Sequence, residues 1–276
     1  MNVSRLLGWS SLLNASRRPM WIYKDIVRDA QAVRAVIDVR DCVFCQQKMK
    51  LIKEDISHPQ SGIDAVVLSI TFCTMCGWWT KKRDVFTFFD NFNTTNYADG
   101  AVGSLRELDV SDQSVPVEEI RSYLAARYDQ RFHVDPWRFE EVVASVYKDI
   151  GYRSRVTARS GDGGIDVVLD GPGNSEIGIQ VKRYRDKIKV EQIRSFVGAL
   201  YLKRMLRGIF ITTSAFQSGA EDVARLSRAR GIPIELVDAD KFYQALGIAQ
   251  RRAYRSLNDP GAPFVNAPLI PLGFSY

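Results

Sequence analysis

The cysteines of this chain form two pairs, with two residues between the members of each pair. The chain of 276 residues has no others, and they are Cys42, Cys45, Cys73 and Cys76. Two such pairs separated by a loop are typical of a structural zinc site, because four thiolates complete a tetrahedron around Zn²⁺ and leave no open position for catalysis. We therefore expect a structural Zn²⁺ held by all four thiolates.

Two disulfides, or thiols that merely pack, are the alternatives to zinc. Disulfides are disfavoured in an intracellular protein, and a thioredoxin-like redox role requires only one pair in a βαβ setting. Gly77, directly after Cys76, favours a tight turn because glycine tolerates positive φ. Alternating apolar residues over 63–72 predict a strand leading into the second pair. The segment resembles a zinc ribbon, a module that often binds nucleic acid or protein, or simply holds a small domain together.

A second constellation lies in the C-terminal half, where charged residues interrupt two neighbouring apolar runs. Asp166 lies within a predicted strand at 165–169, and Gln180 and Lys182 lie at the end of the next strand, at 177–181. Residues i and i+2 of a strand point to the same face, so Gln180 and Lys182 project together. A hairpin-like pairing would bring Asp166 beside them, and Glu140 on a preceding helix adds a second carboxylate.

These residue types suit hydrolysis of a phosphodiester. Carboxylate oxygens hold Mg²⁺, and the metal polarises a phosphate and lowers the pKa of bound water. A lysine can orient that water, stabilise developing negative charge or act as base. The alternative is a structural ion pair between Asp166 and Lys182 at a sheet edge. Glu141 competes with Glu140, but its neighbours at i+4 and i+7, a serine and a lysine, suggest a solvent-facing position.

The order of these motifs resembles the Mrr-type branch of the PD-(D/E)xK restriction endonuclease superfamily. The resemblance extends over about 136–246, and it is carried by Phe139-Glu140, by 161–168 with Asp166, by Gln180-Val-Lys182-Arg183 and by 208–216. It implies that Asp166 binds the metal, that Lys182 is the catalytic lysine and that Glu140 supplies an additional acid. Gln180 takes the position where most of the superfamily has an acid, so Glu140 would compensate for the missing charge.

The resemblance implies an endonuclease that cuts DNA with Mg²⁺ or Mn²⁺, in restriction or antiviral defence. One active site cuts one strand, so a double-strand break would require a homodimer or sequential nicking, and defence-system partner proteins are also expected. Two alternatives stay open. One is a non-catalytic nucleic-acid-binding module, and the other is a nuclease that acts on RNA or branched DNA.

Basic residues crowd around this constellation. Those expected to contact DNA phosphates are Arg159, Arg183, Arg185, Lys187 and Lys189. Such contacts give affinity without reading sequence, although a solubilising surface is the ordinary interpretation. The net charge is +6, and residues 1–115 carry 14 basic and 13 acidic residues, so most of the excess lies in the C-terminal part.

The pattern along the chain predicts an α/β (α+β) protein, with a mixed central sheet flanked by helices and a small N-terminal zinc-ribbon-like β module. We expect an N-terminal region at 1–114, a catalytic domain at 115–250 and an irregular tail at 251–276. Residues 22–36 show a weak helical pattern, and 91–114 is rich in polar residues and glycine, typical of a linker. In the second half, helices are predicted at 117–128, 136–150, 190–201 and 219–230, with strands at 153–157, 165–169, 177–181, 208–213 and 232–237.

No stretch approaches the roughly 20 apolar residues of a membrane helix, and the first 20 residues are too weakly apolar for a secretory signal. The sequence therefore predicts a cytoplasmic location and no membrane partner.

Overall fold

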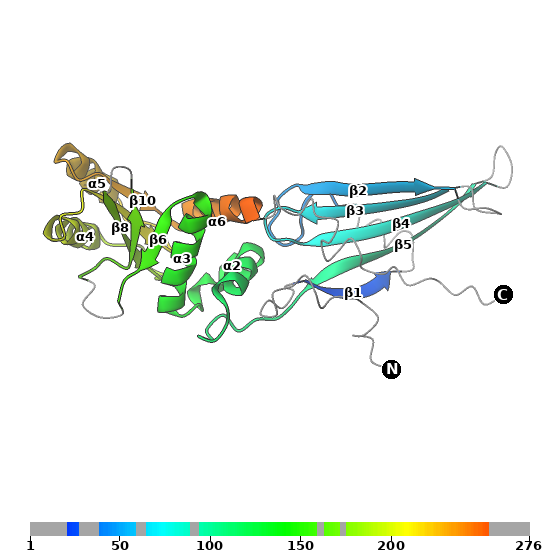
Figure 1. The fold of residues 1–276 in the computed structure, drawn as a ribbon, viewed down its shortest axis with the longest axis horizontal. Coiled ribbons are helices and arrows are strands. Elements are labelled where there is room, and N and C mark those ends of the chain that lie inside the picture. Colours follow the sequence, from blue (N-terminus) through cyan, green and yellow to red (C-terminus); the bar gives the residue numbers. More distant parts are fainter. Residues whose placement is uncertain are drawn as a thin grey trace. The chain divides into compact units, whose positions relative to one another are not determined.

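The computed structural model describes residues 21–27, 39–58, 65–88, 94–158, 163–171 and 175–253. The chain divides into two compact units between Glu107 and Leu108, and the second comprises Leu108–Ala253. Each unit contains its own five-stranded sheet (Figure 1). In the described ranges, no helix is both long and apolar enough to cross a membrane.

The sheet of the first unit is antiparallel throughout, in the order β1-β5-β4-β3-β2. Its strands are β1 (Trp21–Val27), β2 (Met49–Ser57), β3 (Ala65–Cys73), β4 (Trp79–Phe88) and β5 (Thr94–Leu105). The predicted strand at 63–72 is confirmed as β3. The two cysteine pairs lie at one end of this sheet, because Cys73 ends β3 and is paired in register with Met49, the first residue of β2.

Two predictions for the first unit are wrong. The helical pattern at 22–36 begins with β1, whose aromatic and β-branched residues favour a strand and pair with β5; residues 28–38 lie outside the described ranges. The linker expected at 91–114 contains β5, which is hydrogen-bonded to β1 on one side and β4 on the other. Pairing on both edges satisfies the backbone polar groups of this strand and outweighs its poor local propensity.

The sheet of the second unit is mixed, in the order β10-β9-β8-β7-β6. Its strands are β6 (Arg153–Val156), β7 (Val167–Asp170), β8 (Glu176–Lys182), β9 (Arg207–Thr212) and β10 (Ile234–Val237). Strands β6, β7 and β8 pair antiparallel, whereas β8, β9 and β10 pair parallel. The predicted mixed sheet is therefore confirmed, and the junction between its two halves lies at β8.

Helices cover both faces of this sheet, with α4 and α5 on one side and α3 and α6 on the other (Figure 1). The helices are α2 (Val117–Ala126), α3 (Pro136–Ile150), α4 (Val190–Leu202), α5 (Ala220–Ala229) and α6 (Ala239–Ala253), with a 3₁₀ turn, η2 (Tyr128–Phe132), between α2 and α3. The sequence analysis did not anticipate η2 or α6. On one face Phe196 and Phe210 form the core, and on the other Phe139 contacts Phe242, with ring centroids 5.5 Å apart in both pairs.

The ends of α3 follow from its sequence. The Asp135 side chain accepts a hydrogen bond from the backbone N–H of Arg138, which caps the helix, and Pro136 occupies the first turn. Gly151 ends the helix with φ of 116°, a left-handed conformation that glycine adopts without penalty. These caps define where α3 begins and ends, and thereby the position of Glu140 along the helix.

Candidate functional site

Both the backbone and the carboxylate of Asp166 form hydrogen bonds with neighbouring segments. It lies directly before β7 rather than inside it, but the strand pairing continues through it: its N–H donates to the carbonyl of Ile179 at 2.8 Å and its carbonyl accepts from the N–H of Thr157 at 2.9 Å. Its carboxylate oxygen Oδ2 accepts a hydrogen bond of 2.6 Å from the backbone N–H of Val181. Asp166 is 6% exposed, so this carboxylate is buried at a fixed position.

The register of the β7–β8 hairpin brings Gln180 opposite Asp166. Val167 pairs with Ile179, and one further step along the antiparallel register matches residues 166 and 180. A Cβ atom on Gly164 would lie 3.3 Å from Nε2 of Gln180, so the amide end of this buried side chain reaches back to the turn that precedes Asp166. Gly164 has φ of +84°, a conformation suited to glycine.

Lys182 is the last residue of β8, and it pairs in parallel register with Thr212 of β9. Strand alternation places residues 178, 180 and 182 on one face. A Cβ on Gly178 would contact Leu200 of α4, so this is the face covered by α4. Asp166, Gln180 and Lys182 therefore lie on two paired strand ends, as the sequence spacing requires.

Glu140 lies on α3, which packs against β6 and β7. Its neighbour Phe139 is fully buried, and Glu140 itself is half-buried. Glu141 forms an ion pair with Arg138 on the same helix. Glu141 thus has a structural partner on the helix surface. Because α3 covers the face of the sheet opposite to α4, strand alternation alone does not bring Glu140 to Gln180 and Lys182.

The basic residues after β8 differ in their surroundings. Arg183 is half-buried and donates to the carbonyl of Phe132, while Arg185 is exposed with its guanidinium 4.8 Å from the centre of the Phe132 ring. Lys187 and Lys189 are exposed, and Lys189 precedes α4. Arg159 lies outside the described residues.

Sequence reasoning missed the role of η2 in this region. Phe132 contacts Arg183 and Arg185 after Lys182, and Arg131 donates to the carbonyl of Thr213 after β9. Only their aromatic and basic character, between two predicted helices, hinted at these contacts.

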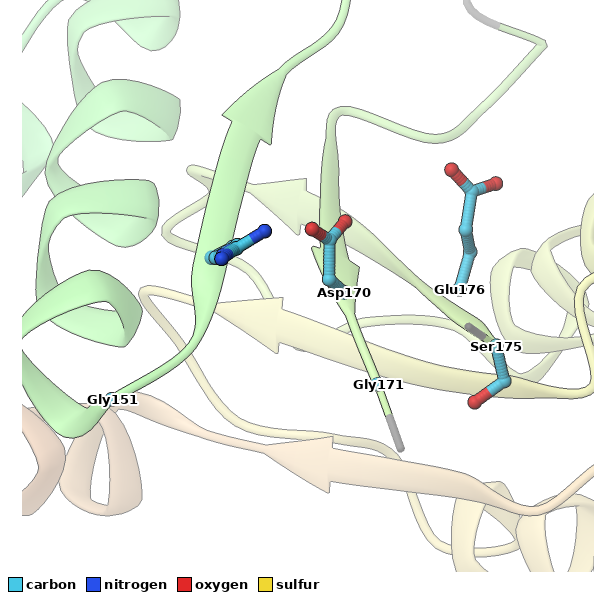
Figure 2. A pocket seen from close by; sticks show the side chains of 6 residues that line it. Gly151, Asp170, Gly171, Ser175 and Glu176 are labelled. Atoms are coloured by element: carbon cyan, nitrogen blue, oxygen red, sulfur yellow. The ribbon is translucent and has the colours of Figure 1, made fainter. Parts of the chain in front are cut away.

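Two hollows lie in the second unit. One of about 650 Å³ adjoins Arg183 and is lined by residues 108–111, Gln130, 132–136 and Arg183. The other, of about 470 Å³, is lined by Gly151, Arg153, Asp170, Gly171, Ser175 and Glu176. Figure 2 shows the carboxylates of Asp170 and Glu176 projecting to the same side there. Asp170 and Glu176 pair at the far end of the β7–β8 hairpin from Asp166, so this second hollow does not belong to the same site.

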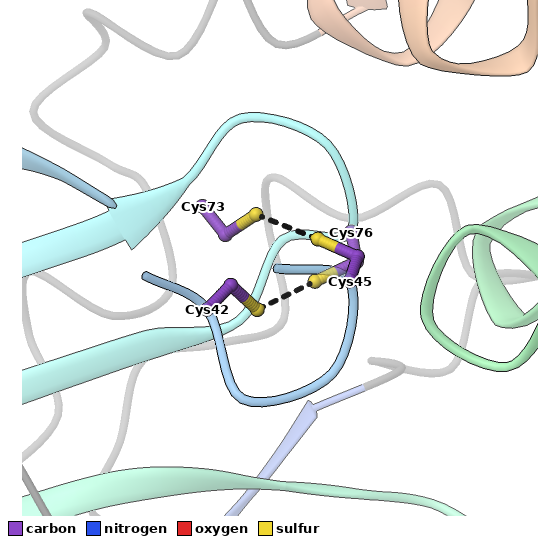
Figure 3. Close-up of side chains that lie close together, drawn as sticks. All are labelled: Cys42, Cys45, Cys73 and Cys76. Atoms are coloured by element: carbon purple, nitrogen blue, oxygen red, sulfur yellow. Dashed lines mark hydrogen bonds between the residues drawn. The ribbon is translucent and has the colours of Figure 1, made fainter. Parts of the chain in front are cut away.

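The four cysteines converge in the first unit (Figure 3). Their sulfur atoms all lie within 4.8 Å of one another, with Cys42 Sγ 3.5 Å from Cys76 Sγ and Cys45 Sγ 3.3 Å from Cys73 Sγ. A tetrahedral zinc with Zn–S bonds of about 2.3 Å separates its sulfurs by roughly 3.8 Å. All four are buried free thiols rather than disulfides, so the cluster fits a zinc ion.

The two knuckles share one backbone geometry. In the first, the N–H of Gln46 donates to the carbonyl of Cys42 at 2.9 Å; in the second, the N–H of Gly77 donates to the carbonyl of Cys73 at 2.9 Å. Gln46 and Gly77 both have positive φ, 58° and 82°. The tight turn predicted at Gly77 is confirmed, and Gln46 adopts the same strained conformation without the freedom of glycine.

The thiols also alter one another's acidity. Hydrogen bonds from the other three cysteines, that of Cys42 first, hold the pKa of Cys73 below its usual range. The pKa of Cys76 is raised, first by its hydrogen bond with Cys42. Such a close cluster favours a thiolate at one sulfur even before a cation binds.

The second unit thus has a mixed sheet between two helical layers, with an acid, an amide and a lysine at its paired strand ends. Residues 132–246 match the family Mrr_cat, described as restriction endonuclease. This segment of the chain is therefore similar to Mrr-type restriction endonuclease domains. The predicted fold class and the predicted resemblance of this half are thereby confirmed, whereas the zinc module remains a prediction.

One protein is similar to this chain in sequence and one solved structure aligns with part of it. The type IV methyl-directed restriction enzyme EcoKMrr of Escherichia coli (strain K12) is 35% identical over 117 residues, which are 40% of this chain and 38% of that protein. The chain thus matches less than half of the length of this relative. The DNA modification-dependent restriction endonuclease AspBHI aligns in structure with a TM-score of 0.35 and 12% identity, over 66% of this chain and 61% of that one.

Proposed function

We propose that this protein is a metal-dependent endonuclease that hydrolyses DNA phosphodiester bonds, with Asp166, Gln180, Lys182 and Glu140 as its site. The observation that carries the proposal is the bond from the Val181 N–H to the Asp166 carboxylate, together with the β7–β8 register. These two features bring the acid beside the strand end that bears the amide and the lysine. A structural ion pair would not require this ordered set of residues within a restriction endonuclease domain.

The residues fit a hard divalent cation, because Asp166, Glu140 and Gln180 offer carboxylate and amide oxygens, the ligand types that Mg²⁺ and Mn²⁺ prefer. When bound, such an ion would polarise the scissile phosphate and lower the pKa of a bound water. The buried Asp166 carboxylate is oriented by the hydrogen bond that its Oδ2 accepts from the Val181 N–H. Lys182 would orient the attacking water and stabilise charge that develops on the phosphate.

DNA binding is assigned to the basic segment after β8, namely Arg183, Arg185, Lys187 and Lys189, with Arg159 as a further contact. Of these, Arg185, Lys187 and Lys189 are exposed. Cations in such positions contact the phosphate backbone and provide affinity that does not depend on sequence. A Zn²⁺ bound by Cys42, Cys45, Cys73 and Cys76 would stabilise the first unit. A cytoplasmic restriction role, a homodimer for double-strand cleavage and defence-system partners complete the proposal.

The test is cleavage of modified and unmodified DNA with Mg²⁺, Mn²⁺, Ca²⁺ or EDTA. Lys182→Ala should abolish cleavage with Mg²⁺ or Mn²⁺ while DNA affinity changes less than about threefold, because one of several cations is lost. Lys148→Ala, an exposed residue near the end of α3, is the control and should cleave like the unmodified protein. If the protein binds DNA but never cuts with any metal, it is a binding module; if it cuts only RNA or branched DNA in competition, the substrate class is wrong.

A further inference from the structure

Five side chains form one continuous stack that runs from α6 through η2 to the basic segment after β8. The rings of Tyr243 and Tyr128 lie 4.5 Å apart. The guanidinium of Arg131 lies 4.7 Å from the Tyr128 ring and 4.1 Å from the Phe132 ring. The guanidinium of Arg185 lies 4.8 Å from the same Phe132 ring. A guanidinium over an aromatic ring is attracted by the negative face of that ring, so each ring and each guanidinium in the stack restricts the position of its neighbour.

Arg131 also connects this stack to Lys182 through hydrogen bonds. Its Nε donates to the carbonyl of Thr213 at 2.9 Å, and its Nη1 donates to the carbonyl of Tyr128 at 3.0 Å. The N–H of Thr213 in turn donates to the carbonyl of Lys182 at 3.2 Å, and the Thr213 hydroxyl donates to the carbonyl of Tyr184 at 2.9 Å. Thr213 is fully buried, so water does not compete for the hydrogen bonds that it forms with Arg131, Lys182 and Tyr184.

The segment after β8 needs such support because its strand pairing ends at Lys182. Arg183 donates to the carbonyl of Phe132, and the Ser214 hydroxyl donates to the carbonyl of Arg185 at 2.8 Å. Every residue from 182 to 185 thus has a contact to η2 or to the residues after β9, while the side chains of Tyr184 and Arg185 stay exposed.

We propose that Arg131 and Phe132 of η2 are positioning residues of the nuclease site, Arg131 for Lys182 and Phe132 for the DNA contact of Arg185. The inference rests on the proposed function and deepens it. Arg131 directs two donors at two carbonyls while its planar group lies between two rings, a combination that lysine cannot reproduce. Phe132 presents a flat face on which Arg185 is held ready for a phosphate, so less side-chain freedom is lost on binding.

The Arg131 arm is tested with Arg131→Lys, which keeps the charge. We expect the single-turnover cleavage rate at saturating DNA to fall at least tenfold, while the Kd for DNA stays within twofold and the protein still unfolds cooperatively near the original Tm. Arg127→Ala is the matched control, because Arg127 directly precedes η2 and forms an exposed ion pair with Asp129. A cleavage rate of Arg131→Lys within twofold of the unmodified protein overturns this arm.

The Phe132 arm is tested by a double-mutant cycle in DNA affinity. Phe132→Leu and Arg185→Ala should each raise the Kd three- to tenfold, and the double variant should bind no more weakly than Arg185→Ala alone. Phe132→Tyr keeps the ring and should restore the affinity. Fully multiplicative losses in the double variant, or unchanged affinity of Phe132→Leu, overturn this arm.

Failure of the positioning proposal and failure of the nuclease proposal give different results. If the unmodified protein cleaves DNA and both variant sets behave like it, the positioning role is wrong and the nuclease assignment stands. If the unmodified protein binds DNA without cleaving it under any metal, the nuclease assignment is wrong, and the binding cycle still decides whether Phe132 holds Arg185.

Discussion

The carboxylate of Asp166 accepts a hydrogen bond from the backbone N–H of Val181, the residue between Gln180 and Lys182, at 2.6 Å. Two sequence motifs that are 14 residues apart are thereby joined at a single buried contact. The contact fixes Asp166 against the strand end that bears the amide and the lysine. We therefore expect a change at residue 166 to alter the free energy of unfolding as well as the cleavage rate of the proposed site.

Replacement of Asp166 should separate these two effects. Asp166→Ala removes the acceptor of a buried N–H, which costs about 1–3 kcal/mol in the free energy of unfolding. Asp166→Asn keeps an oxygen acceptor and should retain most of that stability, but it removes the negative charge and should lower cleavage by about 10³-fold. Urea unfolding and single-turnover cleavage measure the two quantities. Equal stability of the two variants would show that the Val181 contact contributes nothing.

The adjacent glutamates of α3 should behave differently. Glu140→Gln should lower cleavage about 100-fold or more, because it removes the second carboxylate of the proposed metal site. Glu141→Gln should leave cleavage within twofold and cost at most about 1 kcal/mol in stability, since it loses only a partly exposed ion pair with Arg138. If Glu141→Gln is the inactive variant, the assignment of the two carboxylates is reversed.

The cysteine cluster should bind one zinc ion per chain. Elemental analysis of purified protein should find about one Zn²⁺, and Cys42→Ser should lose most of it. Because Trp78 is buried in the second knuckle, with its Nε1 donating to the carbonyl of Gly103 at 2.8 Å, removal of zinc by a chelator should shift tryptophan emission to longer wavelength. A protein free of metal with unchanged emission would show that the thiols only pack.

A partly buried ion pair joins the neighbouring strands β4 and β5 of the first unit. Nε and Nη2 of Arg83 on β4 donate to the two carboxylate oxygens of Asp99 on β5, at 2.8 and 2.6 Å, and Asp99 is fully buried. Arg83→Met should cost about 3 kcal/mol, because it leaves a buried charge without its partner. Arg83→Met combined with Asp99→Leu should recover much of the loss. Thermal unfolding measures both, and a double variant no more stable than the single one would contradict the expectation.

The sequence by itself determined the parts of this protein that depend on local spacing. The apolar period of α3 and its caps at Asp135 and Gly151 are local features, and the structure has this helix at 136–150, where it was predicted. The spacing of Gln180 and Lys182 likewise predicts that their side chains share a face, because strand alternation is local, whereas the position of Asp166 depends on the pairing of β7 with β8. The cysteine spacing predicted a cluster for the same reason, and the four sulfurs do converge.

Only the tertiary structure decided the features that depend on partners distant in the chain. Residues 22–27 became a strand rather than a helix, and the glycine-rich segment before Leu105 became the strand β5. These two strands pair with each other although the partners Trp21 and Leu105 lie far apart in sequence. The contact of Arg131 with Thr213 joins residues 82 positions apart, which no local pattern encodes. Hydrogen bonding and packing across such distances outweigh the small free-energy differences of local propensity, so they could be found only in the folded chain.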